Sequence, residues 1–178
     1  NYGVQLTTNA DFNIIDRNNI STNGTGANNY GIISTTATGN NITNNIIATN
    51  GTSANYGIIL QTDSNTTRAE NNNITTSRGT NSYAIYIDNA NDSVINNSEL
   101  YEPSQWIFMN TGTNVSFSNT TFRNINGTIN FLGTFNLNGT RNITLDLINT
   151  TYNRSFVNSS NLTYLNQSAT VRLYIPGL

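Results

Sequence analysis

Few side chains in this chain could do acid–base or metal chemistry. It contains 9 Asp or Glu and 7 basic residues, all of them Arg, and it has no His, Cys or Lys. Without His and Cys, the usual ligand sets for zinc, copper, iron–sulfur clusters and haem are missing, as are the Ser-His-Asp and Cys-His groups of nucleophilic catalysis. Only carboxylate, Tyr and Arg chemistry remains, and we predict no cofactor, no catalytic residue and no metal site.

The carboxylates that lie close in sequence are the remaining candidates for catalysis. They are Asp88 with Asp92, Asp63 with Glu70, and Glu99 with Glu102, with Arg68 and Arg78 nearby. Paired carboxylates can act as acid and base on a glycosidic bond, or as calcium ligands. Their spacing matches no catalytic motif, and they lie at turn-like segments beside Asn-x-Ser/Thr motifs. We therefore predict that the chain is not an enzyme, and keep a polysaccharide lyase or hydrolase as the alternative.

The Asn-x-Ser/Thr sequon is the strongest functional signal. It occurs 18 times, whereas random placement of the same residues predicts roughly 9 occurrences. A sequon accepts an N-glycan only where it is exposed in a secreted chain, so we expect an extracellular or cell-surface protein with about a third of the sites occupied. Asn23, Asn50, Asn65 and Asn126 are the best candidates, because each lies at an evident turn. The full set is Asn19, Asn23, Asn41, Asn50, Asn65, Asn73, Asn91, Asn96, Asn114, Asn119, Asn126, Asn138, Asn142, Asn149, Asn153, Asn158, Asn161 and Asn166.

Composition excludes several other classes of protein. The net charge is -2 and the few Arg form no basic patch, so we do not expect a nucleic-acid partner. No run of 18 apolar residues is present, so we expect no membrane span in this segment. Asn, Thr and Ser number 37, 28 and 15, but 20 Ile, 9 Tyr and 7 Phe recur regularly, which argues against disorder. The chain opens in the middle of a pattern, and we expect it to be part of a longer secreted protein.

The elements that position these residues are internal repeats. Asn1-Tyr2-Gly3-Val4 returns as residues 29–32, 55–58 and, more loosely, 82–85, with the tyrosines 28, 26 and 27 residues apart. A second element rich in Asn and Ile follows each one, and then comes a small polar turn segment. Short alternating runs separated by turn residues predict strands, and a period of about 27 residues fits one coil of a parallel β-helix.

The predicted fold class is all-β: a right-handed parallel β-helix of five or six coils over residues 1–140, followed by a C-terminal β segment over 141–178. One parity of each strand is apolar and should face inward. The predicted inward residues are Tyr30, Ile32, Ile42, Ile46, Tyr56, Ile58, Leu60, Ile74, Tyr83, Ile85 and Ile87.

Stacking of equivalent residues gives the asparagines and tyrosines a structural role. Asn side chains can form hydrogen-bonded ladders between coils or adopt left-handed corners, and we expect this of most of Asn41, Asn45, Asn73 and Asn97. Tyr2, Tyr30, Tyr56 and Tyr83 are expected to form a core aromatic stack rather than a sugar-binding strip. The Thr-rich stretch at 34–38 is interpreted as an ordinary solvated strand face.

Residues 55–100, with Tyr-Gly-Ile-Ile-Leu and Asn-Asn-x-Ile elements, resemble the right-handed parallel β-helix of the pectate-lyase-like superfamily. They are especially similar to NosD-type repeats common in archaeal surface proteins. Members named for copper handling imply metal ligands that this chain lacks. The lyases imply clustered acidic calcium ligands with a catalytic Arg or Lys, and no position here matches that pattern.

The segment 141–178 loses the repeat and is predicted to be a cap or a donated strand, with the strand at 169–175 a candidate for pairing with a neighbouring copy. We expect a homo-oligomer or polymer that associates through β-edges. The predicted function is a secreted structural or adhesive surface protein, such as a filament or coat subunit. A carbohydrate-binding β-helix without catalysis is a further alternative.

Overall fold

The computed structural model contains strands and turns, with no helix among the residues that it describes, which are 1–77, 79–101, 105–109, 115–118, 121–123, 128–131 and 144–146. All of the strand pairs in its three sheets are parallel. The predicted fold class, an all-β parallel solenoid, is therefore confirmed.

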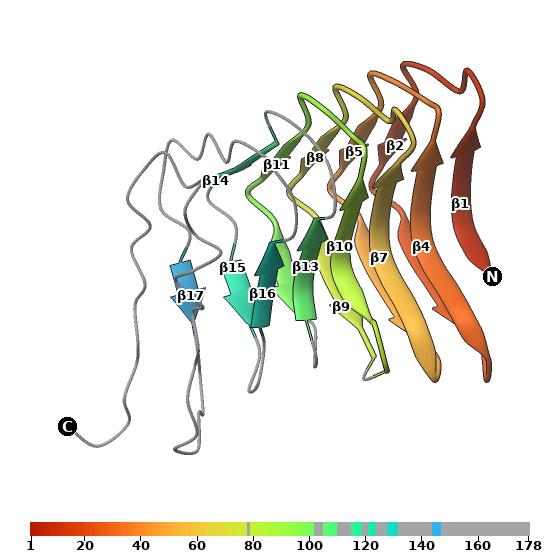
Figure 1. The fold of residues 1–178 in the computed structure, drawn as a ribbon, viewed down its shortest axis with the longest axis vertical. Coiled ribbons are helices and arrows are strands. Elements are labelled where there is room, and N and C mark those ends of the chain that lie inside the picture. The colour runs from red at the N-terminus through yellow and green to blue at the C-terminus, as the bar shows by residue number, and fades with distance from the viewer. Residues whose placement is uncertain are drawn as a thin grey trace.

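Three sheets run along the stack, each built from one strand per coil (Figure 1). Sheet A contains β1 (Tyr2–Thr7), β4 (Ala27–Thr35), β7 (Ser53–Gln61), β10 (Tyr83–Asp88), β13 (Gln105–Met109) and β16 (Thr128–Phe131). Sheet B contains β2 (Ile14–Asp16), β5 (Asn41–Thr43), β8 (Arg68–Glu70), β11 (Val94–Asn96) and β14 (Ser116–Ser118). Sheet C contains β3 (Asn19–Asn23), β6 (Ile46–Asn50), β9 (Asn73–Thr76), β12 (Glu99–Tyr101), β15 (Thr121–Arg123) and β17 (Thr144–Asp146).

Each coil consists of one strand from sheet A, one from sheet B and one from sheet C. Four coils lie within residues 1–101, against the five or six predicted for residues 1–140, and β13 to β17 continue the order of the sheets. The right-handed winding stays a prediction. Apart from the backbone of β17, the C-terminal segment 141–178 lies outside the described residues, and so does the candidate donor strand at 169–175.

The core is made of columns of aliphatic side chains at identical register. In sheet C, Ile20 pairs with Ile47, and Ile47 with Ile74. In sheet B, Ile15 pairs with Ile42. Together with the inward residues of sheet A, these columns form one continuous cluster. The predicted inward residues that prove to be buried are Ile32, Ile42, Ile58, Leu60, Ile74, Tyr83, Ile85 and Ile87.

Ile46 was predicted to face inward, and this was wrong: it is 56% exposed, whereas Ile47 is fully buried. The reason is the corner that precedes the strand. Asn44 has a φ of 56°, and the buried Asn45 follows it. This left-handed residue turns the chain between two sheets, so the inside–outside alternation starts afresh after the corner, with Ile46 on the outside.

The prediction that Tyr30 and Tyr56 point inward was also wrong, because both side chains are only half-buried. The glycine after each tyrosine is the residue that faces the core. A Cβ on Gly31 would lie 2.3 Å from the Ile47 Cγ2, so no larger residue fits there without a shift. Gly31 and Ile32 are both buried, so strict alternation is interrupted at this point of the strand.

Candidate functional site

Buried asparagines connect successive coils through a side-chain ladder. Asn45 is 1% exposed, and its Oδ1 accepts hydrogen bonds from the Asn18 backbone N (2.9 Å) and Nδ2 (3.1 Å). Its own backbone N and Nδ2 donate to the Asn72 Oδ1 at 3.0 and 3.1 Å, and Nδ2 also donates to the Ile15 carbonyl at 2.8 Å. Every polar atom of this side chain is therefore paired inside the solenoid, which is what a buried amide requires.

Two further asparagine ladders connect the coils. Asn1 Nδ2 donates to the Asn29 Oδ1, and Asn29 Nδ2 donates to the Asn55 Oδ1. Asn13 donates through N and Nδ2 to the Asn40 Oδ1. In the fourth coil serine hydroxyls replace the amide acceptors: Ser82, Ser93 and Ser98.

The third ladder has a gap in the third coil, where Thr67 occupies the position of an asparagine. Both the Asn40 Nδ2 and the Thr67 Oγ1 are buried without a hydrogen-bond partner. This pair is the one break in otherwise satisfied amide ladders in the described coils 1 to 3.

A second group of asparagines forms the corners. Their φ angles of 47–65° lie in the left-handed region, which Asn tolerates better than most residues. They are Asn9, Asn28, Asn44, Asn71, Asn81, Asn89 and Asn97.

Of the four asparagines expected at corners or in ladders, Asn45 is a ladder residue and Asn97 is a corner residue. Asn41 and Asn73 have neither role, because they lie on outward strand positions. Sequence reasoning missed the buried Asn29, Asn40, Asn55 and Asn72. A signal was present, because Asn29 and Asn55 directly precede Tyr-Gly, and Asn40 and Asn72 are each the Asn directly before the Asn that opens a strand.

The sequon asparagines form a third group, and none of those that the structure describes is buried. Asn19, Asn23, Asn50 and Asn73 are exposed, and Asn41, Asn65, Asn91 and Asn96 are partly exposed. The strand sequons place Asn and the hydroxyl residue outward and an Ile inward, as in Asn19-Ile20-Ser21. The remaining ten predicted sites lie outside the described residues: Asn114, Asn119, Asn126, Asn138, Asn142, Asn149, Asn153, Asn158, Asn161 and Asn166.

Each asparagine is assigned to one of these three groups, although the sequon residue Asn65 also bonds between coils: its Oδ1 accepts the Asn91 backbone N at 2.7 Å. Within residues 1–101, 8 asparagines belong to ladders, 7 form corners and 8 are sequon acceptors, and together they include every asparagine of this range. No ladder or corner asparagine begins a sequon.

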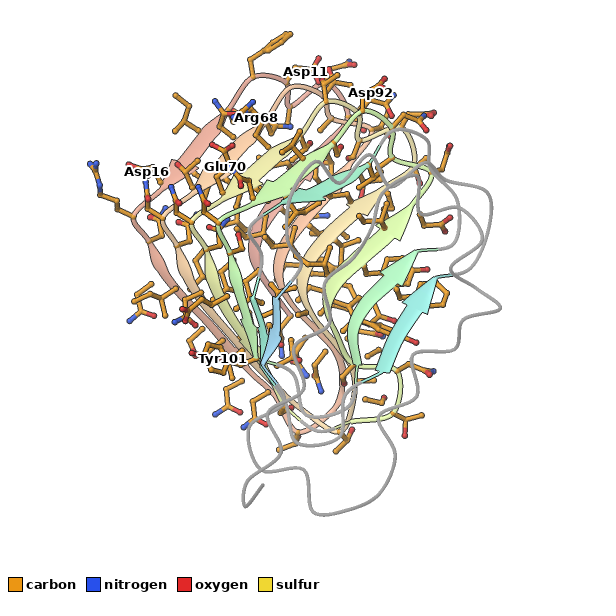
Figure 2. All side chains as sticks on the ribbon, turned by 90° about the vertical axis from the view of Figure 1, so that its left-hand side faces the viewer. Asp11, Asp16, Arg68, Glu70, Asp92 and Tyr101 are labelled. Carbon is orange, nitrogen blue, oxygen red and sulfur yellow. The ribbon has the colours of Figure 1, made fainter. Side chains whose placement is uncertain are left out.

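The carboxylates bond between coils rather than gathering in pairs. Asp11 Oδ1 accepts from the backbone N and Oγ1 of Thr38, 27 residues further on. Asp63 accepts from Asn89 Nδ2 at 3.1 Å, across 26 residues. These separations are one coil, so these carboxylates have the role of an outer ladder. In Figure 2, Asp11 and Asp92 lie at the loops of the first and fourth coils, and Asp16, Arg68 and Glu70 lie on the outside of sheet B.

Asp16 and Glu70 belong to one outward column of sheet B, with Thr43 between them in register. Hydrogen bonds from Asn44 Nδ2 (2.7 Å) and Thr43 Oγ1 (2.8 Å) lower the pKa of the Asp16 carboxyl. Arg68 and Glu70 form an ion pair on the same strand.

Asp63 and Glu70, one of the candidate carboxylate pairs, each bond to another residue. Asp63 bonds to Asn89, Glu70 bonds to Arg68, and Glu99 accepts from the Tyr101 hydroxyl at 2.9 Å. Glu102 and Arg78 lie outside the described residues. Among the residues that the structure describes, no group of three or more carboxylates could hold a metal ion.

The aromatic rings form a column on the outer side of sheet A, contrary to the predicted core stack. Tyr2 and Tyr30 have centroids 5.4 Å apart, Tyr30 and Tyr56 5.0 Å, Tyr56 and Tyr86 4.9 Å, and Tyr86 and Phe108 5.0 Å. The rings of Tyr30 and Tyr56 are inclined by only 1°. Tyr83 is the buried member and meets Tyr56 at a tilt of 42°.

This column leaves little ring surface for a sugar. A pyranose packs on the face of an aromatic ring, but here each inner ring has both faces against its neighbours. Burial raises the pKa of Tyr56 to about 12, with smaller contributions from Tyr30, Tyr86 and Tyr83. The column therefore stabilises the stack of coils and presents only ring edges.

The Thr-rich stretch at 34–38 is not a uniform solvated face. Ser34 and Ala37 are fully buried, and the Ser64 hydroxyl donates to the Ser34 Oγ at 2.9 Å inside the solenoid. Thr36 forms a left-handed corner with a φ of 52°. The strand ends within this stretch, which explains why no flat threonine surface forms.

Within the described part of the chain, no helix is long and apolar enough to cross a membrane. Comparison with protein-family models, with curated proteins and with solved structures gave no match.

Proposed function

We propose that this chain is an extracellular, N-glycosylated structural or adhesive module of a cell surface. The observation that carries the proposal is the division of the asparagines into three separate groups. The fold needs the ladder and corner asparagines, whereas the strand sequon residues Asn19, Asn41 and Asn73 lie on outward positions and belong to neither group. Exposure is the first requirement for an N-glycan acceptor.

The fold also suits a rigid spacer. Aliphatic columns, amide ladders and a ring column all repeat at the coil spacing, so each coil is bonded to the next on all three sheets. Such solenoids are stable through contacts between neighbouring repeats and can be extended along one axis. Association of copies through β-edges, as in a filament or coat, belongs to the proposal, and so does the resemblance to archaeal surface proteins with NosD-type repeats.

One alternative origin of the sequons must be separated from glycosylation. In a strand with polar outward residues and an inward Ile, Asn-Ile-Ser/Thr can arise from alternation alone. The test is glycopeptide mass spectrometry of material from the native source, with electron microscopy of its assembly state. We expect glycan on outward sequons and an ordered polymer or surface layer. A native chain with the unmodified mass, present as a monomer, would refute the proposal, and cleavage of an acidic polysaccharide would replace it with the lyase alternative.

A further inference from the structure

Ile46 is an exposed aliphatic side chain between two sequon asparagines. It lies on the outer side of sheet C and is 56% exposed. Its register partner in the preceding coil is Asn19, and its partner in the following coil is Asn73. Neighbouring strands lie about 4.8 Å apart, so the two asparagines are about 10 Å apart with the isoleucine midway between them.

In the next outward column, an apolar residue of coil 2 again lies between polar residues of coils 1 and 3. Ser21 and Thr75 complete the sequons of Asn19 and Asn73, and Ala48 lies in register between them. Coils 1 and 3 therefore each present a complete sequon on this face of sheet C. Coil 2 presents Ile46 and Ala48 at the same two positions.

A second exposed isoleucine has a similar neighbour. Ile14 in sheet B is 71% exposed, and its register partner is the sequon residue Asn41. The other exposed large apolar side chains of the described residues have protein contacts of their own: Tyr2 stacks on Tyr30, and Phe12 lies over Gly39. Both exposed isoleucines, Ile14 and Ile46, are thus in register with a sequon asparagine.

We infer that glycans on Asn19 and Asn73 pack their first sugar over Ile46 and Ala48. The inference rests on the proposed glycosylation and specifies what those glycans contact. A pyranose ring has an apolar face of C–H groups, and burying an aliphatic side chain beneath it removes apolar surface from water. The sugar is attached to an outward Nδ2 one coil from Ile46, so it reaches the isoleucine by lying along the sheet. The spacing of two coils leaves room for one glycan on each side.

The inference is tested with glycosylated chain secreted by a host that modifies sequons. Four proteins are compared: the parent, Ile46→Asn, the pair Asn19→Gln and Asn73→Gln, and the combination of all three changes. Asparagine at 46 begins no sequon because Ala48 occupies the hydroxyl position, and it completes none. Occupancy is measured by glycopeptide mass spectrometry and the Tm by circular dichroism. In the parent background, loss of the two glycans is expected to lower the Tm by about 2–4 °C. In the Ile46→Asn background that shift is expected to disappear.

Asn50 provides the matched control. It is exposed on the same sheet, and its register partner in the first coil is the polar Asn23 rather than an isoleucine. Asn50→Gln should change the Tm equally in both backgrounds. Equal shifts for Asn19→Gln with Asn73→Gln in both backgrounds would overturn the inference and leave the proposed glycosylation intact. Glycan at other sequons but none at Asn19 and Asn73 in native material would do the same. A native chain without any glycan would overturn both.

Discussion

The gap at Thr67 predicts that a single substitution will stabilise the solenoid. Thr67→Asn places an amide between Asn40 and the fourth coil, with almost no change in side-chain volume. The Asn45–Asn72 pair is the template for the geometry, since the Asn72 Oδ1 accepts the Asn45 backbone N at 3.0 Å and Nδ2 at 3.1 Å. An asparagine at 67 can offer the same acceptor to Asn40, whose Nδ2 is now buried and unpaired.

The magnitude follows from the atoms that gain partners. A buried unsatisfied donor costs about 1–3 kcal/mol, and a typical hydrogen bond contributes about 1 kcal/mol net. The new amide must itself be desolvated, but its Nδ2 can donate to the Ala37 carbonyl, as Asn72 Nδ2 donates to the Ile42 carbonyl at the same separation of 30 residues. We expect a net gain of about 1–2 kcal/mol in the free energy of unfolding.

The assay is chemical denaturation followed by circular dichroism, with two controls. Thr67→Val removes the unpaired hydroxyl without supplying an acceptor, so it should gain less than Thr67→Asn. In an Asn40→Ala background the advantage of Thr67→Asn over Thr67→Val should vanish, because the donor is gone. If Thr67→Asn is no more stable than Thr67→Val, or if its advantage persists without the Asn40 amide, the reasoning from ladder geometry is refuted.

Three further predictions concern the outer surface. In unglycosylated chain, Ile46→Ser should change the free energy of unfolding by no more than about 0.5 kcal/mol, whereas Ile47→Ser should lower it by about 3–5 kcal/mol. Equal losses for the two variants in chemical denaturation would contradict the inward and outward assignment of these residues. The pKa of Tyr56 is raised from 10.0 to about 12 in the folded state, so its contribution to the free energy of unfolding should be fully present below pH 10 and be lost between pH 10 and about 12. Tyr56→Phe should make that loss smaller, and an unchanged pH profile in this variant would contradict the prediction. Asn23 and Asn50 are register partners on neighbouring strands, so a glycan on one should hinder a glycan on the other. Mass spectrometry of glycopeptides that contain both sites should find two glycans less often than independent occupancy predicts, and double occupancy at or above that level would contradict the prediction.

The repeat of tyrosine and glycine was enough to predict the coils, because stacking puts equivalent residues in register. Tyr30 pairs with Tyr56 and Ile32 with Ile58, as the spacing of the repeats requires. Aliphatic residues of one parity in sheet A were likewise predicted correctly, since Ile58 and Leu60 are fully buried and belong to the core cluster. Fold class is therefore accessible from periodicity alone in a chain of this kind.

Orientation near the corners could not be predicted in the same way. The parity rule assumes an unbroken strand, but the left-handed Asn44 precedes Ile46 and the close approach of Gly31 to Ile47 follows Tyr30. Each event shifts which neighbour faces the core. Asn29, Asn40, Asn55 and Asn72 were missed for a related reason: an amide at a corner can point inward only when the next coil supplies its partner, and that depends on three-dimensional register.

The separation of the asparagine groups bears on why this chain is so rich in the residue. Ladders need a side chain that both donates and accepts, which favours Asn. Corners need a residue that tolerates positive φ, which Asn does better than most residues, although Thr, Asp, Ala, Arg and Phe also occupy such positions in this chain. An outward strand position such as Asn19 or Asn73 makes neither demand, and Asn is a poor strand former there. Folding therefore accounts for the ladder and corner asparagines and for Asn65, whose Oδ1 accepts the Asn91 backbone N, but not for the outward strand residues Asn19 and Asn73. The proposed glycosylation is the reason that we offer for these two asparagines and for the exposed isoleucine between them.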